Sequence, residues 1–238
     1  MSVWISVIMP ARNAALYVRE AIQSALSQKG VSFELLIADD ASVDKTWDCI
    51  KSFRGDARVK LWKLRRRRGA AATRNLLLKK ARGKYIVPFD ADDLMLPGYL
   101  KTMWKAIDQR PAVGVVFFHQ YFQKKGRRIL KSRKVFNPEQ MWDLLGRGSL
   151  GHPGTMIRCS AIQRIGGYDS SLPFLQDYDL FLRLAEVTRF FCIKGKPRFF
   201  YRKRKGTISD CSKGQYRKIF QHVLNKALLR RYQTRVSW

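Results

Sequence analysis

Short apolar runs alternate with amphipathic stretches along the first part of the chain. Four of these runs are rich in β-branched residues and predict buried strands over residues 3–9, 33–38, 59–64 and 85–89. Between the runs, apolar residues recur every three or four positions and predict helices over residues 14–27, 42–53 and 69–81. Alternating strands and helices build right-handed β-α-β units, so we expect an α/β fold with a Rossmann-like, mostly parallel central sheet flanked by helices.

Polar residues and glycines mark the ends of these helices. We expect Asn13 and Ser42 to cap the first two helices, and Gly83 to close the third, as glycine commonly does. After residue 94 the pattern becomes less regular. It predicts a helix from Pro97, a strand over 112–118, a loop-rich basic stretch over 123–154, a strand over 154–158, helices over 160–165 and 177–187, and strands over 190–193 and 198–201.

The end of the chain has a pattern of its own. Residues 213–238 carry apolar side chains at helical spacing among lysines and arginines, which predicts a C-terminal basic amphipathic helix. Two arrangements fit this helix equally well: docking on an anionic membrane, or packing on the preceding domain. Since the chain has no internal repeat and no clear linker, we expect one domain over residues 1–212 and a helical tail over residues 213–238.

Charge changes the picture more than composition does. The chain has 47 Lys and Arg against 18 Asp and Glu, a net charge of +29, which favours an anionic partner such as nucleic acid or a membrane surface. The apolar content of 46% excludes a mainly disordered chain, no apolar run has the length of a membrane span, and the first residues lack the features of a signal peptide. The four cysteines form no CxxC pair, which argues against a zinc site or a disulfide framework and suits a reducing compartment.

Many of the acidic residues gather in three clusters, namely Asp39 with Asp40, Asp90 with Asp92 and Asp93, and Asp177 with Asp179. The first two clusters directly follow predicted strands, and ligands of open α/β sheets bind beyond the carboxyl ends of the strands. An Asp-x-Asp pair at that edge can share a Mg²⁺ or Mn²⁺ ion with a diphosphate. A single aspartate often caps a helix or shapes a turn instead, but that role explains three clusters less well.

The helix expected from Gly69 has small residues in its first turn, followed by Arg74. This arrangement suits a diphosphate bound at a helix N-terminus, although the alanines fit simple packing of the helix on the sheet as well. No GxGxxG or Walker sequence is present, which counts against a dinucleotide-dependent dehydrogenase and a P-loop NTPase.

Several blocks of the chain resemble, in the right order, those of family 2 glycosyltransferases with the GT-A fold. The resemblance covers about residues 2–210 and is specific for the family, though not for the donor or acceptor sugar. The blocks lie at residues 3–13, 34–44, 69–75, 83–93, 166–169 and 176–183, followed by Tyr201, Arg202 and Ser209.

This resemblance implies inverting transfer of a sugar from a nucleotide-sugar donor, with Mn²⁺ or Mg²⁺ as cofactor. It implies that Asp177 is the general base that deprotonates the acceptor hydroxyl, that Asp92 ligates the metal, and that Asp90 contacts the metal or the ribose. Pro10, Ala11 and Asp40 would hold the nucleotide base. The implied donor-binding positions are Pro10, Ala11, Asp40, Arg74, Asp90 and Ala91.

Two positions depart from the family pattern. Gln176 stands where the family often has Glu before the base, and Arg204 stands where it often has His, so a third metal ligand cannot be carried over to that position. Asp179 is expected to serve the structure. His152 fits a structural hydrogen-bonding role better than a role in the acceptor loop.

The expected partners follow from the resemblance and from the basic surface. We expect a glycan or lipid-linked acceptor of the cell-surface polysaccharide or lipopolysaccharide type, and a cytoplasmic protein that is peripheral on the inner face of the membrane. One alternative is a catalytically degenerate fold of the same kind that binds glycan or lipid. The other is a basic nucleic-acid-binding protein, but the sequence lacks nucleic-acid-binding motifs and this alternative leaves the acidic clusters without a use.

Overall fold

The structure is a computed structural model that describes residues 4–118, 120–124, 127–131, 152–202 and 214–236. Its main sheet has seven strands in the order β10-β6-β9-β4-β1-β2-β3. Strand β9 runs antiparallel to both of its neighbours and the other neighbouring pairs are parallel, so the expected mostly parallel α/β fold is confirmed. The strands are β1 (Ile5–Ala11), β2 (Phe33–Asp39), β3 (Val59–Lys63), β4 (Tyr85–Pro88), β6 (Val113–Phe118), β9 (Thr155–Arg158) and β10 (Arg189–Ile193).

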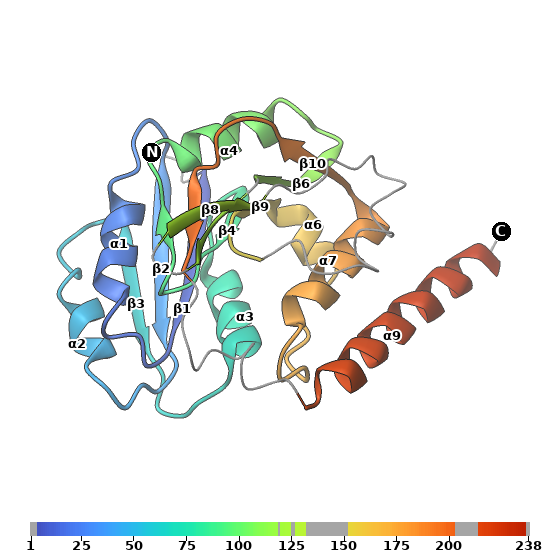
Figure 1. The fold of residues 1–238 in the computed structure, drawn as a ribbon, viewed down its shortest axis with the longest axis horizontal. Helices are drawn as coiled ribbons and strands as arrows, with labels where there is room; N and C mark the ends of the chain where they lie inside the picture. The colour runs from blue at the N-terminus through green and yellow to red at the C-terminus, as the bar shows by residue number, and fades with distance from the viewer. Residues whose placement is uncertain (1–3, 119, 125–126, 132–151, 203–213, 237–238) are drawn as a thin grey trace.

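Helices cover both faces of this sheet (Figure 1). Side chains of α1, α2 and α4 belong to the core on one face, and those of α3, α6 and α7 belong to the core on the other face, where α9 packs outside α7. The helices are α1 (Val18–Leu26), α2 (Thr46–Lys51), α3 (Ala70–Lys80), α4 (Tyr99–Asp108), α6 (Cys159–Arg164), α7 (Gln176–Val187) and α9 (Tyr216–Val236).

Burial on both faces explains why the strands appear in the sequence as unbroken apolar runs. Every residue of β2 is buried. Because successive side chains of a strand point to opposite faces, Leu35 and Ile37 enter one core, while Leu36 and Ala38 enter the other. The carboxyl ends of β1, β2 and β4 are thereby fixed at one edge of the sheet.

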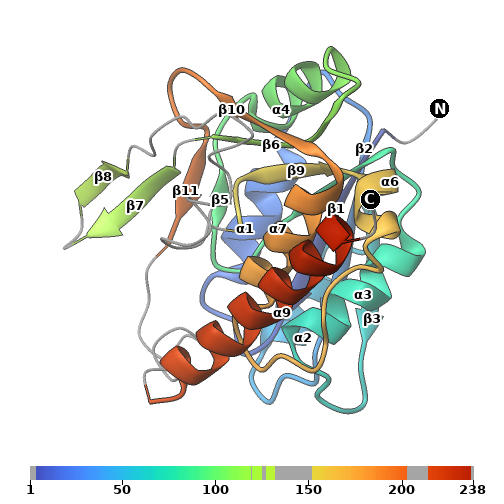
Figure 2. The same cartoon turned by 90° about the vertical axis from the view of Figure 1, so that its right-hand side faces the viewer.

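A second, smaller sheet lies to one side of the main one (Figure 2). Its strand order is β5-β11-β7-β8, and the strands are β5 (Leu94–Met95), β7 (Gln120–Lys124), β8 (Arg127–Lys131) and β11 (Phe199–Tyr201). The expected loop-rich stretch over 123–154 is therefore wrong at 127–131, where β8 pairs antiparallel with β7. Edge strands of native sheets commonly carry charged side chains, and β8 is an edge strand. The basic composition of this stretch therefore did not exclude a strand. Residues 132–151 lie outside the described residues.

The expected caps of α1 and α2 are wrong. Asn13 has a φ of +47° and links two loops instead: its N–H donates to Oγ of Ser42 at 3.0 Å, and its Oδ1 accepts the N–H of Val43 at 3.1 Å. Helix α1 begins only at Val18. Asp44, rather than Ser42, receives the first N–H of α2.

Gly83 is required for a different reason from the one expected. Helix α3 ends at Lys80, and Ala81 is already extended. A Cβ atom on Gly83 would lie 2.5 Å from the backbone N of Ser6 in β1. The glycine therefore permits close contact between this turn and β1, and it does not form a left-handed helix cap.

Helix α9 packs against α7 through its apolar face. The rings of Phe220 and Tyr178 stack at 5.1 Å, and Val223 and Ala227 are fully buried. No helix among the described residues is both long enough and apolar enough to span a membrane.

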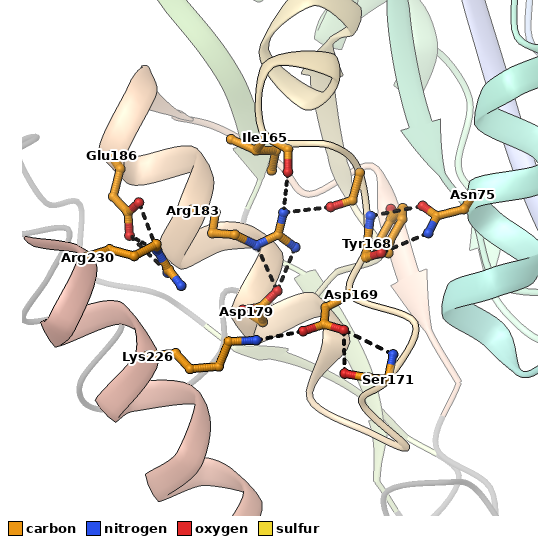
Figure 3. Close-up of polar contacts among 11 residues, drawn as sticks. Asn75, Ile165, Tyr168, Asp169, Ser171, Asp179, Arg183, Glu186, Lys226 and Arg230 are labelled. Atoms are coloured by element: carbon orange, nitrogen blue, oxygen red, sulfur yellow. Dashed lines mark hydrogen bonds and ion pairs between the residues drawn. The ribbon is translucent and has the colours of Figure 1, made fainter.

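Two ion pairs hold α9 in place, as Figure 3 shows. Lys226 donates to Asp169 at 2.8 Å, and Arg230 pairs with Glu186 of α7 at 2.9 Å. Burial alone would raise the pKa of Asp169, but hydrogen bonds from Lys226 and from Ser171 outweigh it and lower this pKa to about 2. The sequence left two arrangements open for the apolar face of this helix, a membrane surface or the preceding domain. In the structure this face packs on the domain.

Candidate active site at the carboxyl edge of the sheet

The two N-terminal acidic clusters lie at the edge where β1, β2 and β4 end. Ala11 and Asp39 pair in register as the last residues of β1 and β2, and Asp90 follows β4 by two residues. Asp39 is fully buried and receives both the N–H and the hydroxyl of Ser42, so it shapes the loop after β2. Open α/β sheets bind their ligands beyond the carboxyl ends of the strands, which is the edge where these clusters lie.

Asp40 joins this edge to the start of α3. Its carboxylate accepts the N–H groups of Arg68 at 2.7 Å and of Gly69 at 2.9 Å, and its own N–H donates to the carbonyl of Ala11 at 2.8 Å. Arg12 donates to the carbonyl oxygen of Asp40 at 2.7 Å. A carboxylate offers about four lone-pair sites, and the N–H groups of Arg68 and Gly69 occupy two of them. The structure thus brings Ala11 and Asp40 together, with Pro10 beside Ala11 in β1.

Arg74, in the second turn of α3, is buried and points to the second acidic cluster. Its Nη2 donates to Oδ1 of Asp90 at 2.6 Å, and its guanidinium carbon lies 5.7 Å from the centre of the Tyr168 ring. Burial works against the charge of Arg74, but attraction to Asp90, Tyr168 and Asp177 outweighs it and raises the pKa of Arg74. A single guanidinium therefore experiences carboxylates from two of the three clusters.

Asp93 is fully buried and anchors the small sheet. Its Oδ1 accepts the N–H of Arg202, just after β11, at 2.9 Å, while its Oδ2 has no hydrogen-bond partner within the described part of the chain. Burial, reinforced by the nearby charges of Asp90 and Asp92, raises the pKa of Asp93 well above its ordinary value. The pKa of Tyr201 is also raised, first by burial and then by the negative charges of Asp93, Asp90 and Asp92. The charge of Asp177 has the smallest effect on it.

Asp177 occupies the first turn of α7, two residues after Leu175, whose φ is +61°. Its charge acts on Arg74 and on Tyr201, so the structure places it at the same site as the Asp-x-Asp cluster although the two are far apart in the sequence. A helix N-terminus favours a carboxylate in its ionised form. Gln176 beside it is buried, and its Oε1 lacks a hydrogen-bond partner among the described residues.

Asp179 has a structural role, as expected from the sequence. It is 1% exposed and pairs with Arg183 one turn along α7, with an Nε–Oδ2 distance of 2.9 Å. Arg183 also donates to the carbonyl oxygens of Ile165 and Gly167 (Figure 3). The pair therefore holds the Gly-Gly turn against α7.

His152 and Tyr168 form a buried pair behind Arg74. Nε2 of His152 lies 2.7 Å from the hydroxyl of Tyr168. Burial first, and then the charge of Arg74, hold the pKa of His152 well below its ordinary value, so its imidazole is neutral. The structural role expected for His152 agrees with this geometry. Tyr168 was not among the expected site residues. Its position directly after Gly166 and Gly167 is the one sequence feature that could have indicated it.

The carboxylates of Asp90 and Asp92 fit a divalent cation whose remaining ligands would include substrate phosphates. No three His, Cys, Asp or Glu side chains in the described ranges form a ready-made metal cluster, and one oxygen of Asp90 is taken by Arg74. Mg²⁺ and Mn²⁺ are commonly held by one or two carboxylates together with substrate phosphates, which is what Asp90 and Asp92 can offer. Arg204, at the position of a possible further ligand, lies outside the described residues.

The chain is similar to known glycosyltransferases. It is 33% identical over 192 residues to the putative glycosyltransferase EpsE of Bacillus subtilis, covering 76% of this chain and 66% of that protein. It is 31% identical over 188 residues to an uncharacterised glycosyltransferase of Methanocaldococcus jannaschii, covering 75% of this chain and 63% of the relative. Chondroitin synthase of Pasteurella multocida is 28% identical over 188 residues, but these span 78% of this chain and only 19% of the synthase. The chain thus spans less than two thirds of these relatives.

Solved structures share the fold. Staphylococcus aureus TarS in complex with UDP-GlcNAc superimposes with a TM-score of 0.74 at 22% identity, over 87% of this chain and 60% of that one. Mannosyltransferase PcManGT from Pyrobaculum calidifontis, in complex with GDP-Man and Mn²⁺, superimposes with a TM-score of 0.67 at 20% identity, over 86% of this chain and 58% of that one. The sequence model named glycosyl transferase family 2 matches residues 6–166, more than half of the chain. The matched family model and the similarity to EpsE show that the chain is a member of glycosyl transferase family 2.

Proposed function

We propose that this enzyme transfers a sugar, with inversion, from a nucleotide-diphosphate sugar to a hydroxyl of a glycan or lipid-linked acceptor. The observation that supports this most directly is the Arg74–Asp90 ion pair at the carboxyl edge of the sheet, with Asp177 acting on the same guanidinium from the N-terminus of α7. In this proposal Arg74 is the cation that binds the donor, Asp90 is the carboxylate on the donor side, and Asp177 is the carboxylate on the acceptor side. The nucleotide-sugar complexes of TarS and PcManGT support the same class of donor.

In the proposed reaction Asp177 accepts the proton of the acceptor hydroxyl, and the acceptor oxygen forms a bond to the anomeric carbon. The bond between that carbon and the diphosphate oxygen breaks, and the nucleoside diphosphate leaves with the electron pair. Asp177 suits the base because a helix N-terminus favours the ionised form of a carboxylate. Arg74 binds the anionic donor, and Asp40 with Pro10 and Ala11 accommodates its base.

A divalent cation, held by Asp92 and Asp90 and completed by donor phosphates, would stabilise the negative charge on the leaving diphosphate. The acceptor we propose is a cell-surface polysaccharide or lipopolysaccharide type of glycan. The similarity to chondroitin synthase supports the polysaccharide class.

The test is hydrolysis and transfer with a panel of nucleotide sugars that includes UDP-GlcNAc and GDP-mannose, in the presence of Mn²⁺. We expect turnover with at least one donor, and loss of turnover in Asp92→Asn and Asp177→Asn. Asp56→Asn is the matched control, because Asp56 pairs with Arg58 on the surface away from the site. Binding of a donor by the wild type without turnover would instead indicate a degenerate, glycan-binding protein. Normal turnover in Asp177→Asn would exclude Asp177 as the base.

We further propose that the outer face of α9 contacts an anionic membrane surface. Leu228, Leu229 and Tyr232 are 51%, 62% and 70% exposed, and helical spacing places them on the same side as Arg217 and Lys218. Helix α9 contains no acidic residue, which disfavours a second copy of the same helix as its partner. Arg and Lys near an anionic leaflet contribute about 1 kcal/mol each, and exposed leucines insert among the lipid headgroups.

Vesicle co-sedimentation tests this surface. Deletion of residues 213–238 is unsuitable, since it would expose the core that α9 covers. We expect the wild type to bind vesicles of phosphatidylcholine with phosphatidylglycerol and not vesicles of phosphatidylcholine alone. Binding should fall in the triple variant Leu228→Ser, Leu229→Ser, Tyr232→Ser. It should persist in Leu16→Ser with Val43→Ser, which removes apolar side chains elsewhere that are even more exposed, at 87% and 85%. Equal binding of all three proteins would refute the proposal.

A further inference from the structure

The guanidinium of Arg74 is fixed by a residue that comes from a distant part of the chain. We propose that Tyr168 is a positioning residue: held by Asn75 and His152, it fixes the Arg74 guanidinium for the anionic part of the donor. This inference rests on the proposed function, because it takes Arg74 as the donor-binding cation. It adds to that function a residue that touches neither donor nor acceptor.

The main chain of Tyr168 is held by a single side chain of α3. Nδ2 of Asn75 donates to the carbonyl oxygen of Tyr168 at 2.8 Å, and the N–H of Tyr168 donates to Oδ1 of Asn75 at 2.9 Å (Figure 3). Asn75 is the residue after Arg74, so the turn is attached to the same part of α3 that carries the cation. Gly167 makes this approach possible, since a Cβ atom there would lie 2.7 Å from Oδ1 of Asn75.

The ring of Tyr168 is held from its other end. Its hydroxyl lies 2.7 Å from Nε2 of His152, and the two rings pack edge to face with their centres 5.4 Å apart. Burial keeps the pKa of Tyr168 above its ordinary value, so the phenol retains its proton and shares one hydrogen bond with the neutral imidazole. His152 packs in turn against Phe181 of α7, with ring centres 6.1 Å apart. Both ends of Tyr168 are thus anchored.

The anchored ring restricts Arg74. The guanidinium carbon lies 5.7 Å from the ring centre, within the range of a cation–π contact, while Asp90 takes Nη2. A ring on one face and a carboxylate on one edge together fix the orientation of a planar group. Nε of Arg74 is buried and has no hydrogen-bond partner among the described residues.

Orientation matters because arginine binds phosphate through a planar fork of N–H groups, and a fork already held in place loses less freedom when the donor binds. Small displacements of a binding group cost much activity, on the order of 100-fold for 1 Å. The structure thus predicts that loss of the Tyr168 ring affects donor binding although the fold and the Asp90 pair remain.

The test compares Tyr168→Leu and Tyr168→Phe with a matched control elsewhere in the fold. Tyr85 is also buried, its hydroxyl donates to Asp108 at 2.6 Å, and the guanidinium carbon of Arg158 lies 5.4 Å from its ring centre. Tyr85→Leu therefore removes the same kind of contact without touching Arg74. The direct readout is ¹⁵N relaxation of the arginine side-chain Nε–H groups, with the Arg74 signal assigned by its absence in Arg74→Lys.

We expect the Arg74 Nε–H to be rigid in the wild type and to become flexible, with an order parameter below about 0.6, in Tyr168→Leu. Tyr168→Phe keeps the ring and should retain a rigid signal, and Tyr85→Leu should leave the Arg74 signal unchanged. In the donor assay, Tyr168→Leu should raise the donor KM about tenfold with little change in kcat.

A rigid Arg74 signal in folded Tyr168→Leu would overturn the inference. So would an equal rise in donor KM in Tyr85→Leu, since that would indicate a general effect on the fold. The relaxation measurement needs no donor. Failure of the wild type to turn over any nucleotide sugar would therefore count against the proposed function, while the Arg74 signal would still decide the positioning role.

Discussion

Two adjacent glycines offer a sharp test of how the turn before α7 is held. Gly166 and Gly167 both have positive φ, at +74° and +79°. A Cβ on Gly166 would meet no atom within 4 Å, whereas a Cβ on Gly167 would lie 2.7 Å from Oδ1 of Asn75. The substitutions Gly166→Ala and Gly167→Ala therefore impose the same backbone strain, and only the second displaces the Asn75 side chain that clamps Tyr168.

The expected magnitudes follow from these contacts. An alanine in the left-handed region costs about 1 to 2 kcal/mol, which is the whole cost expected for Gly166→Ala. Displacing Asn75 also weakens its two hydrogen bonds to Tyr168, at 2.8 and 2.9 Å, each worth about 1 kcal/mol. Gly167→Ala should therefore lower the free energy of unfolding by about 3 to 4 kcal/mol, roughly 2 kcal/mol more than its neighbour.

Urea unfolding, followed by tryptophan fluorescence and far-UV circular dichroism, measures both variants against the wild type. The difference between the two alanine variants isolates the Asn75 clamp, because the strain is common to both. A difference of about 2 kcal/mol corresponds to several degrees in the melting temperature of a chain of this size. If the two variants lose equal stability, the Asn75 clamp contributes nothing and the reasoning is wrong.

Four further expectations can be checked, each by its own measurement. Asp177→Asn should lower kcat about 10²- to 10⁴-fold with an unchanged melting temperature. Asp179→Asn should instead lose about 3 kcal/mol of stability, because it breaks the buried pair with Arg183. An unchanged melting temperature of Asp179→Asn would contradict this. Asp169 has a pKa of about 2 in the folded chain, below its unfolded value, so its bond to Lys226 should add about 1 kcal/mol near neutral pH and lose that contribution as the pH falls from about 4 to 2. Unfolding of Asp169→Asn and wild type at several pH values measures this, and a pH-independent difference would count against it. Chelation with EDTA should abolish sugar transfer and Mn²⁺ should restore it; transfer that persists in EDTA would argue against a metal.

The sequence indicated the donor side of the site because that side is built from local segments. Asp40 and Asp90 each follow an apolar strand, and parallel strands end at one edge, so their proximity could be inferred from the order of elements. Arg74 follows from the same logic, since α3 begins at that edge. The predicted helix caps at Asn13 and Ser42 are wrong, because both side chains bind loop residues instead of their own helices, and local sequence does not show such contacts.

By itself, then, the sequence determined the alternation of strands and helices and the edge at which the carboxylates gather, because burial on alternate sides leaves a periodic record in the chain. Tertiary structure alone decided which distant residues meet. Tyr168 reaches Arg74 only because β9 inserts between β4 and β6 and brings the following turn against α3. Tertiary structure also decided that α7 covers the apolar face of α9. The sequence could not decide this, because the same spacing of apolar residues suits packing on another helix and docking on a membrane. Periodicity records that a side chain is buried, whereas its partner depends on how the elements pack.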